Sequence, residues 1–233
     1  MPGRRVGAVL ATSAVVVLSS LVPQAASRLA ELPGDGAVRL LYAGERPTEA
    51  GLLRVLDSRE AALAWVERAG PHRDLGHFYF VLADELGDTE ERRRTLLLRA
   101  EAELTTAMAR SPADPPTLAL LATTYVELDR PEQARRWLEV AQRIAPFSPE
   151  TALVRAWIAL TTAPPDDPPR PTDARDFRAA FAYDRARFVQ MVMELGARDR
   201  VLPAFAGTEA DYELRVALMR AEEDRLDDSR ADP

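Results

Sequence analysis

The sequence contains no cysteine, no lysine and no asparagine. Without cysteine the chain can form neither disulfides nor cysteine-ligated metal sites, and it has no thiol nucleophile. All 30 basic residues are therefore arginine, and they are outnumbered by 37 acidic residues, which gives a net charge of −7. General nucleic-acid binding needs a concentrated basic surface, which an acidic chain does not favour. We therefore expect no nucleic-acid partner.

Aromatic residues are also scarce, at 6% of the chain, whereas alanine and leucine are plentiful. This composition favours helices that pack through small residues over a sheet rich in aromatic and β-branched side chains. A hydrophobic content of 47% and a charged content of 29% are typical of a folded protein. We predict an all-α fold.

Patterns that carry catalysis are missing as well. The sequence has no Gly-rich phosphate loop and no evident grouping of serine, histidine and aspartate. Its only histidines, His72 and His77, are five residues apart, whereas a metal site on one helix needs a spacing of three or four and a third ligand. We therefore expect no metal, no cofactor and no enzymatic activity, and keep an enzyme as a distant alternative.

The amino terminus carries the one long apolar run. Arg4 and Arg5 precede residues 6–22, which contain no charge and are close to the roughly 20 residues of a membrane span. A signal peptide is the alternative, with cleavage after Ser27 and Ala25 as the small residue before the cut. A buried core helix is disfavoured because the run is apolar on every face. We favour an uncleaved single-pass anchor in the inner (cytoplasmic) membrane, with the arginines in the cytoplasm and the rest in the periplasm.

Breaks rich in proline and glycine divide the chain into six predicted segments. In order, these are a membrane anchor or signal segment (1–26), a linker (27–46) broken at 32–36, a helical repeat domain (47–160), a Pro-rich loop (161–172), a C-terminal helical extension (173–224) and a flexible tail (225–233). Inside them, residues 47–70 are expected to form a hairpin whose second helix begins at Ser58 and ends at Gly70–Pro71. Further helices are expected at 74–86, 89–110, 173–195, 198–205 and from 208 onward.

Residues 115–146 give the clearest pattern, two amphipathic helices joined by a short turn at 128–131. The stretch resembles the tetratricopeptide repeat, whose sparse pattern is W-x2-L-G-x2-Y…A-x3-F…P with a period of 34 residues. The matching positions are Leu118, Leu121, Ala122, Tyr125, Ala134, Leu138, Ala141 and Pro146.

Counting in steps of 34 residues extends the resemblance over about residues 74–160. One step back gives Ala100, Leu104, Ala107 and Pro112. The first helix of that earlier repeat would be 74–86, with a longer turn at 87–92. One step forward gives Ala152, Ala156 and Ala159, after which the period fails at the Pro-rich stretch. We predict a short, degenerate α-solenoid of this kind.

The resemblance implies a protein-binding groove formed by the first helix of each repeat. In the best repeat, Ala119, Thr123, Val126 and Glu127 would face it. Some members of the family clamp a terminal carboxylate with Lys and Asn, but Ala119 and Leu120 occupy those positions, so that mode is not expected. The expected function is a periplasmic scaffold tethered through residues 6–22. Its layout is similar to that of small bacterial proteins of surface-polysaccharide synthesis or export. The alternative is an assembly factor for a secretion, pilus or respiratory complex.

Overall fold

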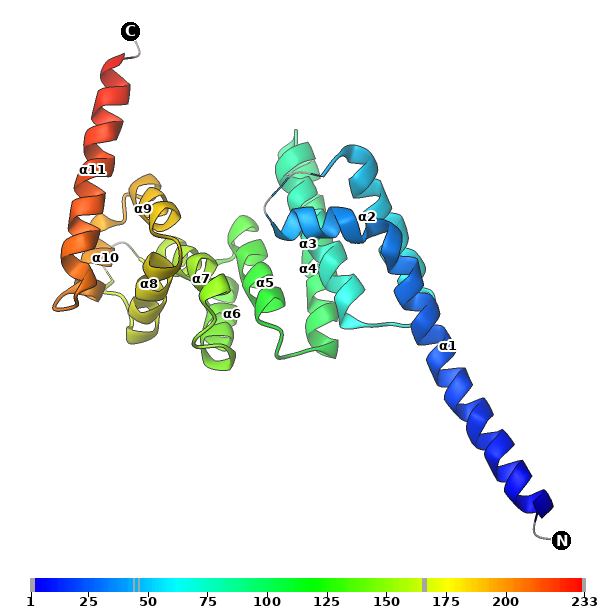
Figure 1. Ribbon diagram of the computed structural model, residues 1–233. Coiled ribbons are helices and arrows are strands. Elements are labelled where there is room, and N and C mark those ends of the chain that lie inside the picture. The colour runs from blue at the N-terminus through cyan, green and yellow to red at the C-terminus, as the bar shows by residue number, and fades with distance from the viewer. Residues whose placement is uncertain (1–2, 44, 46, 165–166, 232–233) are drawn as a thin grey trace. The chain divides into compact units, whose positions relative to one another are not determined.

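A computed structural model describes residues 3–43, 45, 47–164 and 167–231, with side chains placed for all of these except 3–18, 20, 86 and 226–231. Within these residues the chain forms eleven α-helices and no β-strand, which confirms the all-α prediction (Figure 1). The arrangement is consistent with a helical repeat solenoid. The chain divides into two compact units, unit 1 (Met1–Pro112) and unit 2 (Ala113–Pro233), and each is described by itself.

Unit 1 begins with one continuous helix, α1 (Gly3–Tyr42), which contains both Pro23 and Pro33. The predicted break at 32–36 is therefore wrong. Proline removes a helical hydrogen bond, yet α1 stays helical through both, and around Pro33 it packs against the next helix. Gly34 is needed for that packing, because a Cβ there would lie 2.2 Å from the Ser58 hydroxyl oxygen.

Helix α2 (Glu49–Leu63) folds back along α1 (Figure 1). It starts with Thr48, whose hydroxyl accepts a hydrogen bond from the Gly51 amide at 3.2 Å. The predicted hairpin in 47–70 is wrong, because Ser58 lies inside this single helix and donates to the Val55 carbonyl instead of capping. Gly70 and Pro71 do not end a helix either. They lie in the first turn of the next helix, α3 (Ala69–Leu86), where proline is tolerated.

The last two helices of unit 1 form a hairpin, α3 (Ala69–Leu86) and α4 (Glu90–Arg110). Helix α4 agrees with the predicted helix at 89–110. Helix α3 ends at 86 as predicted but begins five residues before the predicted start at 74. The Thr89 hydroxyl caps α4 by accepting from the Arg92 amide. Of the positions found by counting back one repeat, Ala100, Leu104 and Ala107 are buried and Pro112 is exposed. The hairpin is close-packed at Gly76, where a Cβ would lie 2.5 Å from Leu104 Cγ.

Unit 2 opens with the predicted hairpin, formed by α5 (Pro115–Glu127) and α6 (Pro131–Ile144). Asp114 caps α5 by accepting from the Thr117 amide, and each helix begins with proline. In the connecting turn Asp129 adopts a left-handed conformation (φ 57°), which aspartate tolerates. Apart from Tyr125 and Pro146, which are partly buried, every residue that defined the repeat is buried.

A further hairpin follows, formed by α7 (Pro149–Thr162) and α8 (Pro171–Tyr183). The period fails at the Pro-rich stretch, as predicted, but the pairing of helices continues beyond it. Two arginine side chains bind the carboxyl end of α7: Arg135 donates to the Ala159 carbonyl and Arg200 to the Leu160 carbonyl, at 3.2 and 2.7 Å.

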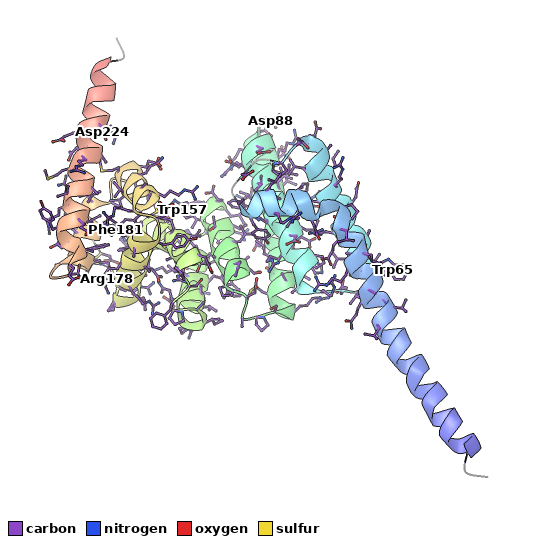
Figure 2. All side chains as sticks on the ribbon, viewed as in Figure 1. Trp65, Asp88, Trp157, Arg178, Phe181 and Asp224 are labelled. Atoms are coloured by element: carbon purple, nitrogen blue, oxygen red, sulfur yellow. The ribbon has the colours of Figure 1, made fainter. Side chains whose placement is uncertain are left out.

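Three helices complete the unit, α9 (Arg185–Glu194), α10 (Arg198–Phe205) and α11 (Ala210–Ala231). The single helix predicted at 173–195 is thus two helices, because Asp184 interrupts it and caps α9 through the Arg187 amide. A core of four phenylalanines joins α8, α9 and α10, with Phe181 labelled in Figure 2; its members are Phe177, Phe181, Phe188 and Phe205. Helix α11 continues to Ala231, so the predicted tail is helical up to that residue.

The predicted membrane anchor falls mostly on residues whose side chains lie outside the structural description. Among the described residues, none of the helices offers an apolar stretch long enough to cross a bilayer. The backbone of residues 6–22 is helical, as part of α1. The anchor itself stays a prediction.

Candidate functional site

The predicted groove residues all lie on α5, but they differ in how much surface they offer. Ala119 is only 5% exposed, so it presents almost nothing to a partner. Thr123, Val126 and Glu127 are half-buried. The Thr123 hydroxyl donates to the Ala119 carbonyl at 3.0 Å, and Val126 packs against the core of unit 2. As a partner site this surface remains a prediction.

A shallow groove lies between α9 and α11, here called the α9–α11 groove. It consists of two adjoining stretches of about 530 and 720 Å³. Four residues line both stretches, Ala186, Val189, Ala221 and Asp224. Figure 2 labels Asp224 on α11. The groove belongs wholly to unit 2.

The α9–α11 groove combines an apolar floor with a charged rim. Alanine and valine side chains from both helices make the floor, with Met193 at one end. The rim carries both signs of charge, and an ion pair between Arg185 and Glu213 joins the two helices. Tyr212, on the rim, is 77% exposed. An apolar strip bordered by mixed charge is the chemistry that an amphipathic protein segment recognises.

The sequence contained a signal for this groove that we did not use. The apolar positions of the last helix are Tyr212, Leu214, Val216, Leu218 and Met219. The structure buries Leu214 and Leu218, which are four residues apart, and leaves Tyr212 and Met219 exposed. One helix face cannot hold all of these residues. Of those off the buried face, Tyr212 and Val216 line the groove, whereas Met219 does not.

Unit 2 also contains a fully buried ionic centre. The Arg155 guanidinium binds both carboxylate oxygens of Asp176, at 3.1 and 2.9 Å. It also donates to the Thr151 hydroxyl and to the carbonyls of Ala145 and Ser148. All five of its N–H donors are therefore used. With no exposed atom to offer a ligand, this centre stabilises the fold.

The two histidines lie on α3 but serve different contacts. His72 Nδ1 is 2.7 Å from Glu103 Oε2 on α4. The His77 ring packs against Tyr42 at a tilt of 57°, with ring centroids 4.9 Å apart. Burial, with a further contribution from Arg73, lowers the pKa of His77 from 6.5 to about 4. No group of three or more possible metal ligands occurs among the residues that the structure describes.

Helix α3 carries a second copy of the repeat pattern that a fixed 34-residue step misses. His72, Leu75, Gly76 and Tyr79 have the same spacing as Leu118, Leu121, Ala122 and Tyr125. Both hairpins have a three-residue connection, at 87–89 and 128–130. The expected longer turn at 87–92 is therefore wrong. The extra residues instead lengthen both helices of the first hairpin, which have 18 and 21 residues against 13 and 14.

These hairpins, with small residues at their crossings, define an all-α protein built from helical repeats. Residues 97–158 match the model of the tetratricopeptide repeat family. The match begins in α4 and ends in α7, about a quarter of the chain, and supports the assignment of this part to the family. Comparisons with curated proteins and with solved structures found no match. Repeats of this family suggest a protein–protein interaction scaffold and are typically non-catalytic.

Proposed function

We propose that this protein is a membrane-tethered scaffold and that the α9–α11 groove holds a segment of its protein partner. The observation that carries the scaffold is the array of helical hairpins with its match to the tetratricopeptide repeat. The groove adds an apolar floor and a rim of both charges. The predicted surface on α5 is the alternative site on the same unit.

The tether is residues 6–22, and the periplasm is the compartment of the two units. The continuity of α1 supports this proposal, because one helix joins the apolar run to the packed part of unit 1 without a linker. The charge pattern supports the orientation, since Arg4 and Arg5 precede the run. A topology reporter fused after Pro233 tests it, and activity of that reporter in the cytoplasm would overturn it.

The pathway is proposed from the order of the segments. An anchor, a degenerate alanine-rich repeat and a helical tail are the layout of small proteins that accompany surface-polysaccharide synthesis or export. Assembly or stabilisation of another envelope complex is the second candidate. The identity of a co-purified partner distinguishes the two, because a glycosyltransferase or polymerase favours the first and a secretion, pilus or respiratory subunit the second.

The test is affinity capture of the full-length protein from membranes in mild detergent. Wild type should retain a partner that survives washing. Ala186→Glu, which puts a charge on the floor of the α9–α11 groove, should lose it. Ala182→Glu is the matched control, since Ala182 is an exposed alanine on α8 that does not line the groove.

The outcomes separate the scaffold from its site. A wild-type protein that retains nothing would overturn the scaffold. A partner that survives Ala186→Glu but is lost with Thr123→Arg would move the site to α5. Circular dichroism of each variant checks that the fold is kept. The two alanine substitutions are at exposed positions and should change stability by only about ±0.5 kcal/mol, whereas Thr123 is half-buried.

A further inference from the structure

Trp65 is the most unusual exposed side chain of unit 1. It lies in the turn that follows α2, and its amide donates to the Ala62 carbonyl at 3.2 Å. Its side chain is 56% exposed, although tryptophan offers a large apolar area for burial. Figure 2 shows the labelled Trp65 beside α1. A large ring with an apolar face and a polar N–H is most favourably placed where apolar and hydrated surroundings meet.

The position of Trp65 along α1 follows from the register of α1 and α2. Gly34 is level with Ser58, where the two helices approach closely. Arg59 donates to the Glu31 carbonyl at 2.7 Å, and nearer the amino terminus Ser27 donates to the Ala62 carbonyl at 2.9 Å. The two helices are therefore antiparallel, and residue numbers on α1 fall as those on α2 rise.

Continuing this register places Trp65 at the end of the apolar run. Ser27 is level with Ala62. Trp65 lies three residues after Ala62, so it is level with about residues 23 and 24 of α1. The last residues of the run, Leu21 and Val22, are each 55% exposed. Because α1 is one helix, no linker separates this level from residues 6–22.

We propose that Trp65 lies in the headgroup region of the bilayer, so that the end of α2 is a second membrane contact beside α1. The inference rests on the proposed tether through residues 6–22. Tryptophan is enriched at membrane–water interfaces because its ring is apolar and its indole N–H is polar. This contact fixes the height of unit 1 above the bilayer, with α2 rising away from the surface.

The charges at the same level suit a headgroup region. Arg28, whose side chain is 71% exposed and forms an ion pair with Glu31 at 3.4 Å, lies six residues beyond Val22, or about 9 Å along the helix axis. A side chain of this length can extend back toward lipid phosphates. Glu67, next to the turn, is paired with Arg110, and Arg68 is paired with Glu31. Each of these two carboxylates at the lipid side of unit 1 therefore has an arginine partner.

The absence of cysteine allows a direct test on the full-length protein in phosphatidylcholine vesicles. Single cysteines at Arg54, Asp57, Ala61 and Ala64, all exposed on or just after α2, receive a fluorophore. These positions cover about 15 Å along the helix. We expect a nitroxide-bearing lipid to quench the label at residue 64 most, with a steady loss of quenching toward residue 54.

The fluorescence of Trp65 itself gives a second measurement. Subtracting the emission spectrum of Trp65→Phe from that of wild type isolates the Trp65 emission, which should be blue-shifted and quenched by brominated lipid.

A label at Leu18→Cys, inside the predicted span, separates the inference from the tether. If that label is quenched by lipid while the α2 labels are equally unquenched, the tether stands and the headgroup contact is overturned. If the label at residue 18 is in water, the tether and the contact both fail. Quenching at residue 18 together with the gradient along α2 supports both.

Discussion

Among the side chains that the structure describes, each unit has one fully buried arginine, and the two arginines are paired differently. In unit 2, Arg155 donates to both oxygens of a single buried carboxylate, Asp176. In unit 1, Arg59 divides its bonds between Asp74 on α3 and Asp35 on α1, at 2.9 and 2.8 Å. We call the Arg155 centre closed, because both of its charged side chains are buried. We call the Arg59 centre open, because one of its carboxylates, Asp35, is partly exposed.

The difference follows from what each arginine connects. Arg155 binds the turn between α6 and α7 and the helix α8, all within consecutive hairpins of the repeat. Arg59 also donates to the Glu31 carbonyl and so holds α1, the proposed membrane helix, against α2 and α3. A bidentate pair with every donor used gives the more rigid centre. The two-carboxylate centre of unit 1 instead ties α1 to both α2 and α3.

The largest effect should come from breaking the closed centre. Asp176→Ala leaves the buried Arg155 without its carboxylate and also removes an acceptor from Gln142. Removing one partner of a buried ion pair costs about 3–5 kcal/mol. Urea unfolding followed by circular dichroism should show this loss, and hydrogen exchange should show it concentrated in α6–α8.

The double variant Arg155→Met with Asp176→Leu is the control for this prediction. It removes both charges and fills the space with apolar side chains, so it should cost less than Asp176→Ala. A double variant that is less stable than the single one would contradict the account, since the hydrogen bonds to the turn would then outweigh the charge pair.

The open centre should give a smaller and more local effect. Arg59→Met leaves Asp74 with the Tyr42 hydroxyl at 3.2 Å and Arg73 at 3.6 Å. We therefore expect the lower end of the range for buried pairs, about 3 kcal/mol. Hydrogen exchange should accelerate in the α1–α2 interface while α5–α8 keep their protection. Arg54→Met, an exposed arginine on the same helix, should change stability by no more than about 0.5 kcal/mol.

The sequence predicts unit 2 well where local and tertiary preferences agree. The α5–α6 hairpin has proline at the start of each helix, an aspartate cap and one continuous apolar stripe. The α8–α9 boundary was missed because Tyr183-Asp184-Arg185 contains neither glycine nor proline. Asp184 could have indicated it, since aspartate is a frequent cap and the Arg187 amide lies three residues on.

Prediction failed in unit 1 where tertiary packing overrides local preference. Pro33, Gly34 and Gly36 are poor helix formers, and their cluster predicted a break. Gly34 is in fact the residue that lets α2 approach, a requirement that only the partner helix reveals. The α9–α11 groove depends in the same way on two helices brought together by the phenylalanine core, so neither helix predicts it alone.

Mild acid should weaken unit 1 selectively, because His77 lies there and residues 113–233 contain no histidine. Burial lowers the pKa of His77 to about 4, so the unfolded chain takes up this proton first as the pH falls below about 6.5. The free energy of unfolding is therefore unaffected by His77 above pH 6.5. It falls progressively between pH 6.5 and pH 4, by about 2–3 kcal/mol.

Urea unfolding as a function of pH, read by hydrogen exchange in each unit, measures this effect. His77→Phe keeps an aromatic ring against Tyr42 and removes the titration, so it should flatten the dependence of unit 1 between pH 6.5 and 4. An unchanged slope in that variant would assign the acid sensitivity to other groups.

The smallest effect compares equivalent positions of the two repeat hairpins, Gly76 in unit 1 and Ala122 in unit 2. Helix propensity alone predicts that Gly76→Ala stabilises α3 by about 1 kcal/mol. The structure predicts the opposite sign, because the new Cβ would lie 2.5 and 2.7 Å from the Leu104 side chain and 3.3 Å from the Ala100 carbonyl. Overpacking costs about 1–3 kcal/mol, so a net loss of about 1 kcal/mol is expected in thermal unfolding.

Ala122→Gly should lose a similar amount for the opposite reason. It removes a buried Cβ, and glycine loses more backbone entropy than alanine on folding. If Gly76→Ala instead stabilised the protein, the two hairpins would tolerate the same crossing distance, and the glycine would not be required by packing.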